Sequence, residues 1–374
     1  MNKAYKFRIY PNKEQKILLN KTFGCTRFVW NIMLAEKKEY YEKNKKSIRL
    51  TPAKYKKEYD WLKEVDCFSL ANVQLQQEKA YKNFFRNKKF GFPKFKSKHN
   101  LKQTYTTNNV KNNIQLLAGY IKLPKLKQVK IKQHRQIIEN SKLKSVTISK
   151  SASDKYYVSI LVEYELKVDY KKNINKTVGL DMSMKNFIVT SDGEKANHPH
   201  WFRKSQTKLA RQQRKLSKKS KGSNNRLKQK KKVAIIHEHI ANQRKDYVEK
   251  LSRQLINQHD YFVLEDINMK NLQQSLKLGK SVNDLGFGKF RERLQQKANE
   301  EGKKIIKIDK WFPSSKLCSR CGHKYSELKL SERSWTCGSC NTTHDRDINA
   351  AINLKNKFLQ DTVGTTGISK ACGQ

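Results

Sequence analysis

Residues 177–193 read TVGLDMSMKNFIVTSDG, two short apolar runs joined by a polar turn. Runs of this length and composition predict a strand–turn–strand hairpin, with Asp181 at the end of the first strand. A carboxylate beside a buried strand is costly unless a partner compensates its charge, and a metal ion is the usual partner. The segment therefore predicts both a central sheet and a metal site at one end of it.

Two further acidic residues lie at the ends of apolar or helical runs. Glu265 closes the apolar run of DYFVLEDINM, and Asp347 begins the helical segment of THDRDINAAINL. One such residue is an ordinary strand end, but three converging carboxylates can hold two Mg²⁺ ions about 3.5–4 Å apart for in-line attack on a phosphodiester. Strands predicted at 177–181, 186–190, 261–265 and 304–308 alternate with long helical stretches, which is typical of an α/β domain. We therefore predict an RNase H-like nuclease domain with Asp181, Glu265 and Asp347 as catalytic magnesium ligands.

Two neighbouring acids are weaker candidates for this site. Strand alternation places Asp266 on the face opposite to Glu265. Asp345 lies two residues before Asp347, so it is a secondary candidate.

Four cysteines form a second site, with two Cys-x2-Cys pairs separated by 15 residues: Cys318, Cys321, Cys337 and Cys340. This spacing predicts tetrahedral coordination of one Zn²⁺ by four thiolates. Four protein ligands leave no open position, so the zinc is expected to be structural. His323 and His344 are then not needed as ligands.

The charge balance identifies a class of partner. The chain has 374 residues, with 81 Lys and Arg against 33 Asp and Glu. An excess of this size opposes folding and favours a nucleic acid as the partner. A membrane surface is the weaker alternative, because basic residues occur throughout the chain. No apolar run is long enough to span a bilayer, so we expect an intracellular protein.

The basic residues are densest at 203–232, where 14 Lys and Arg occur without an acid. Such a run is either a solvated helix face or a surface that follows a nucleic-acid backbone. Arg211 and Arg214 are our candidates for phosphate contacts within it.

The N-terminal half combines strands and helices. Residues 2–9 predict a strand, and helical periodicity follows at about 12–48 and 68–86. Short strands then recur between about 103 and 166, which suggests a small β-barrel or sheet. We expect strand 2–9 to pair with this later sheet, so that the helices form an insertion.

Residues 87–100, NKKFGFPKFKSKHN, interleave phenylalanine with lysine. Such a segment stacks on bases and follows phosphates, or it anchors a basic loop to a core. Lys94 and Lys96 are candidate nucleic-acid contacts here. Gln74 and Gln77, one helical turn apart, are candidates for reading adenine edges.

Six segments of the chain resemble the TnpB family of transposon-encoded nucleases, relatives of type V CRISPR effectors. In order along the chain they are KFRIYPNKEQ, AYKNFFRNKKFGFPKFKSK, GLDMSMKNF, VLEDINM, the four-cysteine ribbon and HDRDINAAINL. The resemblance covers nearly the whole chain. Ser183 departs from it, because many members have glycine there. The end of the chain, TVGTTGISKACG, resembles the family's C-terminal end, and we expect it to be disordered.

The resemblance implies an RNA-guided DNA endonuclease associated with an insertion sequence. A guide RNA from the transposon end selects the target, and one RuvC site cuts double-stranded DNA beside a short transposon-adjacent motif. Asp181, Glu265 and Asp347 match the family's catalytic acids, and the four cysteines match its zinc ribbon. We expect one protein monomer on one RNA, located in the bacterial cytoplasm and associated with the nucleoid when on target.

The implied fold is an α+β multidomain arrangement. Its parts are a wedge-type β-barrel (1–10 and 101–172), an inserted helical recognition lobe (11–100), a RuvC domain of RNase H-like fold (173–312 and 343–360), an inserted zinc ribbon (313–342) and a disordered tail (361–374).

Two other functions stay open at this point. A guided DNA-binding repressor would bind without cutting, although derivatives of that kind typically lose a catalytic acid and this chain retains all three. An RNA-free structure-specific nuclease or transposase would need no guide, and a transposase would also join strands.

Overall fold

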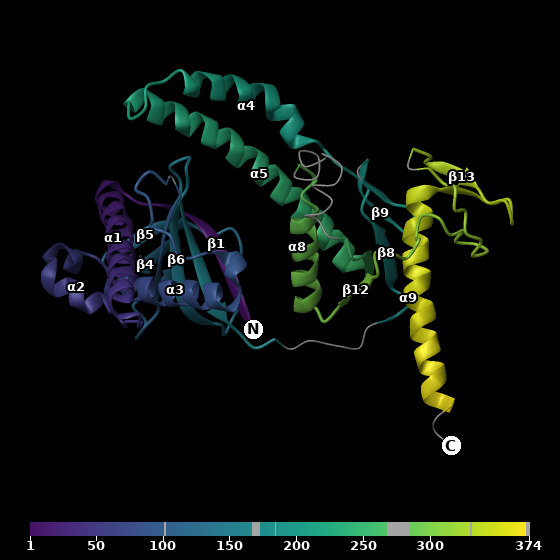
Figure 1. Ribbon diagram of the computed structural model, residues 1–374, viewed down its shortest axis with the longest axis horizontal. Helices are drawn as coiled ribbons and strands as arrows, with labels where there is room; N and C mark the ends of the chain where they lie inside the picture. The colour runs from purple at the N-terminus through teal and green to yellow at the C-terminus, as the bar shows by residue number, and fades with distance from the viewer. Residues whose placement is uncertain (101, 167–172, 184, 268–283, 330, 372–374) are drawn as a thin grey trace. The chain divides into compact units, whose positions relative to one another are not determined.

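The computed structural model describes residues 1–100, 102–166, 173–183, 185–267, 284–329 and 331–371, with side chains up to residue 362. The chain divides into two compact units (Figure 1). The first contains Met1–Leu166 and Asn224–Ile235, and the second contains Lys167–Ser223 and Ile236–Gln374. No helix in the described ranges combines the length and apolar composition needed to cross a membrane.

The first unit is built on a curled, antiparallel seven-stranded sheet of order β2-β6-β7-β1-β5-β4-β3. Its strands are β1 (Asn2–Tyr10), β2 (Gln103–Asn108), β3 (Gln115–Leu117), β4 (Tyr120–Leu123), β5 (Lys127–Lys132), β6 (Lys142–Lys150) and β7 (Tyr156–Glu163). Strand β1 pairs with both β7 and β5, which confirms the predicted pairing across the helical insertion. Alternation buries Tyr5, Phe7 and Ile9 of β1 in the core.

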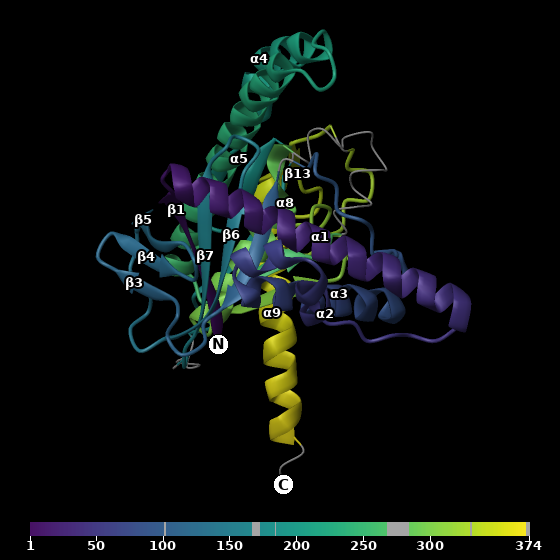
Figure 2. The same cartoon turned by 90° about the vertical axis from the view of Figure 1, so that its left-hand side faces the viewer.

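The helices between β1 and β2 cover this sheet and form a second core. They are α1 (Lys13–Asn44), α2 (Pro52–Glu58), η1 (Asp60–Glu64), α3 (Cys67–Arg86) and η2 (Lys88–Phe90). A reciprocal capping box between Asn12 and Gln15 fixes the start of α1. Helix α1 crosses the sheet (Figure 2). Its Leu19 and Phe23 belong to the sheet's hydrophobic core. The sequence predicts α1 and α3 but misses the two short helices between them.

The second unit contains a five-stranded sheet of order β10-β9-β8-β11-β12. Its strands are β8 (Thr177–Asp181), β9 (Asn186–Thr190), β10 (Lys195–Asn197), β11 (Tyr261–Glu265) and β12 (Lys304–Ile308). Strands β8, β11 and β12 are parallel, while β9 and β10 are antiparallel. Four of these strands coincide with the predicted ones, and only the three-residue edge strand β10 was not predicted.

Helices of the second unit pack around this sheet. Helices α8 (Phe287–Glu300) and α9 (Arg346–Ala371) contact its strands. Helix α4 (Trp201–Ser217) also belongs to the second unit, while α5 (Asn224–Gln258) begins in the first unit and ends in the second. Two short strands, β13 (Ser334–Thr336) and β14 (Thr343–Asp345), form a hairpin before α9. Helix α9 lies against β8 (Figure 1).

Helix α9 is longer than the sequence predicts. It continues to Ala371, so the described residues after 360 are helical, where the sequence predicts a disordered tail. The Lys357–Asp361 ion pair, spaced four residues apart, and a hydrogen bond from the Thr362 hydroxyl to the Phe358 carbonyl continue the helical pattern here.

Candidate active site and metal centre

The first two predicted carboxylates end neighbouring parallel strands. In the register of β8 and β11, Leu180 is opposite Leu264, so Asp181 and Glu265 are the next residues of the two strands. Adjacent strands lie about 4.8 Å apart. The sheet therefore places these two carboxyl groups side by side at the C-terminal ends of its central strands.

A close approach of helix and strand brings in Asp347. A Cβ atom at Gly179 would lie 1.8 Å from the carbonyl oxygen of Ala351, so α9 touches the backbone of β8 at this point. Asp181 is two residues beyond Gly179 on the same face of the strand. Asp347 is one helical turn before Ala351 on the same face of the helix. Asp181 and Asp347 therefore lie at the same end of the sheet.

Glu265 faces the same side. Val263, two residues earlier on β11, packs in one cluster with Leu354 of α9. Because alternate strand residues share a face, Glu265 points to the face that α9 covers. The structure thus brings all three predicted carboxylates to one face of the sheet.

The electrostatics of this site favour a bound cation. Burial, and then the neighbouring charges of Asp347 and Glu265, raise the pKa of Asp181 to about 7. Burial also raises the pKa of Glu265. Crowded carboxylates supply oxygen ligands only, which suits Mg²⁺, and a cation between them would relieve their repulsion. The residues present fit the predicted metal.

Two side chains hold Asp347 in place. The Ser183 hydroxyl donates to Asp347 Oδ2 over 2.8 Å in a buried position, and Arg333 Nη1 lies 3.2 Å from Asp347 Oδ1. Neither contact follows from the sequence. The sequence shows Ser183 only as a departure from the glycine of many family members, and Arg333 is remote in sequence from Asp181 and Glu265.

The neighbouring acids have structural roles. Asp345 accepts hydrogen bonds from the amides of Asp347 and Ile348, capping α9, and pairs with Lys195 at 2.6 Å. The carboxylate of Asp345 is therefore occupied by contacts at the start of α9. Asp266 pairs with Arg291 and Lys307.

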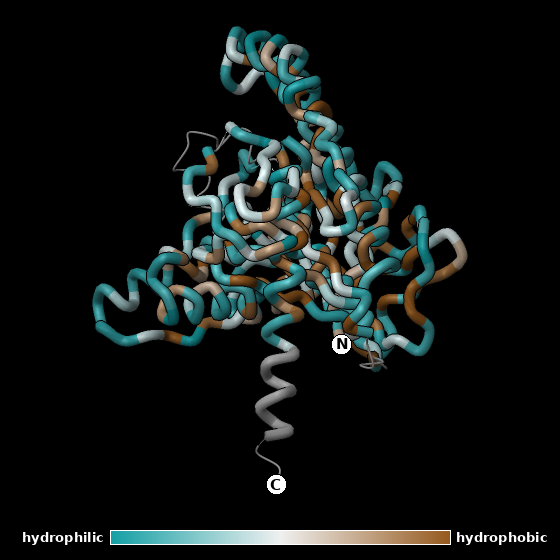
Figure 3. Tube along the Cα trace, turned by 90° about the vertical axis from the view of Figure 1, so that its right-hand side faces the viewer, coloured by the Kyte–Doolittle hydropathy of each residue, from teal (hydrophilic) through white to brown (hydrophobic). Residues whose placement is uncertain are grey.

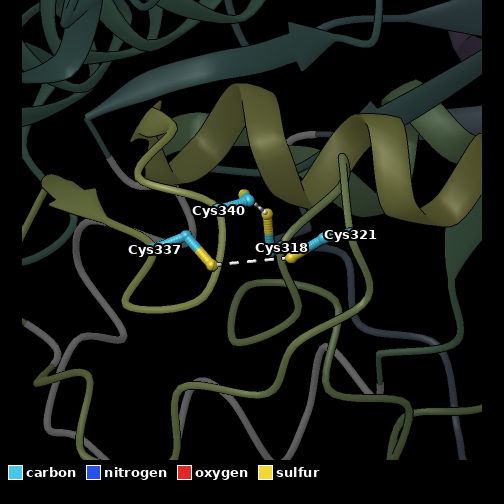
Figure 4. A group of neighbouring side chains, drawn as sticks. All are labelled: Cys318, Cys321, Cys337 and Cys340. Atoms are coloured by element: carbon cyan, nitrogen blue, oxygen red, sulfur yellow. Dashed lines mark hydrogen bonds between the residues drawn. The ribbon is translucent and has the colours of Figure 1, made fainter.

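The four predicted cysteines converge on one point (Figure 4). Their sulfur atoms lie within 4.8 Å of one another, with Cys318–Cys340 and Cys321–Cys337 separations of 3.6 Å. Tetrahedral Zn²⁺ with Zn–S bonds of about 2.3 Å requires sulfur separations of about 3.8 Å. The geometry fits zinc held between two loops.

Groups around the cysteines fix the cluster. His344 Nε2 lies 3.0 Å from Cys318 Sγ, and its ring packs on Trp335. Burial lowers the pKa of His344, so a neutral ring with a proton on Nε2 can donate to the sulfur. Asn349 and Asn353 of α9 donate to the carbonyl oxygen of Leu317, which attaches the first cysteine loop to the helix bearing Asp347.

Comparisons with known proteins agree along most of the chain. Family models match residues 159–276 ("Probable transposase", OrfB_IS605), 287–354 ("Cas12f1-like, TNB domain") and 1–46 ("Helix-turn-helix domain"). A Streptomyces pristinaespiralis protein named "Putative RNA-guided DNA endonuclease" is 33% identical over 362 residues, spanning 95% of this chain and 89% of its own. "Putative RNA-guided DNA endonuclease InsQ" of Escherichia coli (strain K12) is 32% identical over 373 residues, spanning 94% and 91%. Shorter matches carry the name "TnpB-like protein". The chain belongs to the TnpB family.

A solved structure shares the fold of this TnpB-family chain. The protein of a Cas12f1–sgRNA–target DNA complex matches with a TM-score of 0.52 at 14% identity, covering 95% of this chain and 99% of that one. The residues matched by the helix-turn-helix model form β1 and α1 here, a strand followed by one long helix.

One further cluster in this TnpB-family chain resembles a metal site: His198, His200 and Asp284. His198 Nδ1 accepts a hydrogen bond from the His200 amide at 2.7 Å, so in the neutral ring Nε2 carries the proton and offers no lone pair. Asp284 Oδ1 is already paired with Arg244 at 3.0 Å and accepts from the Phe202 amide. The cluster therefore fixes the start of α4.

The six residues predicted to contact nucleic acid differ in their burial. Gln77 is fully buried and donates to the Trp30 carbonyl, so it packs in the helical core and cannot read a base edge. Gln74 is half-buried and donates to Glu78. The four predicted basic residues are all exposed: Lys94, Lys96, Arg211 and Arg214. Helix α4, which carries both arginines, is hydrophilic over most of its length (Figure 3).

Proposed function

We propose that this protein is an RNA-guided DNA endonuclease encoded by an insertion sequence. A guide RNA from the transposon end pairs with the target strand, and the protein cuts double-stranded DNA beside a short transposon-adjacent motif. One observation carries the proposal: Asp181, Glu265 and Asp347 face the same end of one sheet in a chain of net charge +48. The names of the full-length relatives support it.

The catalytic chemistry is phosphodiester hydrolysis. Two Mg²⁺ ions bound by the three carboxylates would supply an activated water and stabilise charge on the phosphate. Ser183 orients Asp347 through its hydrogen bond, and Arg333 balances part of the negative charge at the same carboxylate. Asp345 and Lys195 hold the start of α9 against this site.

The remaining parts of the chain stabilise the fold and bind nucleic acid. The four cysteines hold one structural Zn²⁺, which stabilises the loops packed on α9. The exposed lysines and arginines hold the guide–target duplex through its phosphates, while base pairing supplies the sequence specificity. One protein acts on one RNA.

The proposal is tested by purifying the protein from cells that carry its native flanking DNA and sequencing the RNA that accompanies it. We expect one dominant RNA ending in a variable guide, and Mg²⁺-dependent cutting of a matching DNA. Asp181→Asn should abolish cutting and retain guided DNA binding, while Asp246→Asn, at an exposed carboxylate on α5, should cut normally.

Other outcomes select the alternatives. Guided binding without cutting by the unaltered protein would identify a repressor. Cutting of branched DNA without RNA would identify a structure-specific nuclease, and strand joining would identify a transposase.

A further inference from the structure

Phe92 of the segment 87–100 and the aromatic end of α3 line a cavity that the nuclease mechanism does not use. This cavity has a volume of about 830 Å³ and lies between α1, the second half of α3 and the chain at Phe92. Its aromatic lining comes from Tyr41, Tyr81, Phe84, Phe85 and Phe92. Phe85 is 75% exposed and Phe92 is 40% exposed, so large aromatic side chains are grouped at the surface here. The cavity therefore presents aromatic surface to solvent in the first unit.

The walls of this cavity are fixed before any ligand binds. Trp30 Nε1 donates to the Lys94 carbonyl at 2.9 Å, and Asn31 exchanges hydrogen bonds with the backbone of Lys96 in both directions. The Phe92 ring packs edge-on against Tyr81 and Phe84, with ring centroids 5.4 Å away in each case. A preformed cavity of this kind binds without the entropic cost of ordering its walls.

The cavity lining combines aromatic rings with three lysines and two glutamates, a mixture that suits a ligand with a flat apolar part, amino groups and a phosphate. Lys37, Lys38 and Lys82 line it, and Lys38 Nζ lies 5.3 Å from the Phe92 ring centroid. Glu42 and Glu78 also line it, which gives carboxylate oxygens for base amino groups. Aromatic rings with lysines at the rim are the combination that binds single-stranded nucleic acid, by stacking on bases and attracting phosphates.

We propose that this cavity holds an unpaired base of the guide RNA, stacked on Phe85 with its backbone at the surrounding lysines. The inference rests on the proposed function, because that function supplies the RNA. RNA is favoured over the guide-paired target strand because a stacking cavity needs a base free of its pair. Unpaired bases are what proteins read in structured RNA, while the target strand is paired to the guide. A base with an amino donor, which adenine, guanine and cytosine have and uracil lacks, suits the two carboxylates.

The test is an anisotropy titration of the full chain, freed of RNA by high salt, with a fluorescein-labelled 12-nucleotide single-stranded RNA. Phe85→Ala should weaken binding of this RNA by about 10-fold, as expected for one lost stacking contact. Its salt dependence should stay unchanged, because no phosphate contact is removed. Binding of a double-stranded RNA of the same length should also stay unchanged. Tyr120→Ala, at an exposed tyrosine on β4, is the matched control.

Four results would overturn the proposal. Phe85→Ala could bind the single-stranded RNA as well as the unaltered protein, or lose duplex RNA equally. It could weaken only a single-stranded DNA of the same sequence, which would assign the cavity to the displaced DNA strand. Sedimentation could show a dimer that Phe85→Ala dissociates, which would assign it to a second copy of the chain.

The titration is independent of cleavage. If guided cutting fails while Phe85→Ala still weakens the RNA selectively, the proposed function is wrong and the RNA-binding cavity stands. If cutting is guided and the titration shows no effect, only the cavity assignment fails.

Discussion

Gly179→Ala is expected to disable the nuclease without touching a carboxylate. The new methyl group would lie 1.8 Å from the carbonyl oxygen of Ala351 and 3.1 Å from the Lys355 amide nitrogen. All of these are backbone atoms of α9, so no side chain can rotate away. Ala351→Gly cannot relieve the clash, because the carbonyl oxygen remains.

The size of the required movement follows from the contact distance. An ordinary contact needs at least 3.4 Å, so helix and strand must separate by about 1.6 Å along this direction. Asp181 lies on the strand and Asp347 on the helix, so their separation changes with it. A misplacement of about 1 Å can cost about 100-fold in rate. We expect a loss of cleavage of at least that size, with about 1–3 kcal/mol of lost stability from overpacking.

The assay is single-turnover cleavage of a guide-matched DNA at saturating protein, with guided DNA binding measured in parallel. Binding should be retained, because the residues proposed to contact phosphates are not altered. Gly288→Ala is the control, since its added methyl group meets no atom within 4 Å in α8 of the same unit. A Gly179→Ala protein that cleaves within threefold of the unaltered rate would refute the reasoning.

Three further predictions concern the zinc cluster, Ser183 and His198. Cys318→Ser should lower bound zinc, measured by mass spectrometry, well below one ion per chain, because it breaks the tetrahedral shell; full zinc content would contradict this. Ser183→Ala removes a buried hydrogen bond to Asp347, and such a bond to a charged group contributes about 1.5–3 kcal/mol. Cleavage should therefore need a higher Mg²⁺ concentration, while guided binding is retained. An unchanged Mg²⁺ concentration at half-maximal cleavage would exclude the proposed role of Ser183. Burial, with a smaller contribution from His200, lowers the pKa of His198 from 6.5 to about 4. The unfolded chain therefore takes up this proton first as pH falls, and the free energy of unfolding should decrease between pH 7 and 4.5. His198→Asn should lose that part of the pH dependence in urea titrations, and an equal pH dependence in both proteins would rule it out.

Local sequence patterns were sufficient to predict most helices and strands and the candidate metal-binding residues. The strands at 177–181 and 261–265 were predicted because each is a short β-branched and aromatic run that must be buried. The cysteine spacing identified the four-cysteine cluster because thiolate ligands on tight loops need that spacing. Short elements such as α2 and β10 were missed, since too few residues carry a periodic signal.

The predictions for Gln74 and Gln77 show the limit of helical spacing. Spacing placed both glutamines on a helix but did not tell its exposed face from its buried one. In the structure Gln77 is inside, bonded to the Trp30 carbonyl, because α3 packs on α1 along that line.

The sequence by itself determined which residues have the chemistry for this site, because charge, thiol spacing and strand composition are local properties. Only the tertiary structure decided how they meet. Gly179 matters because α9, remote in the sequence, crosses β8 without room for a side chain. Ser183 and Arg333 reach Asp347 across loops that no periodicity connects. Contacts of this kind depend on packing between distant segments, which a linear pattern does not encode.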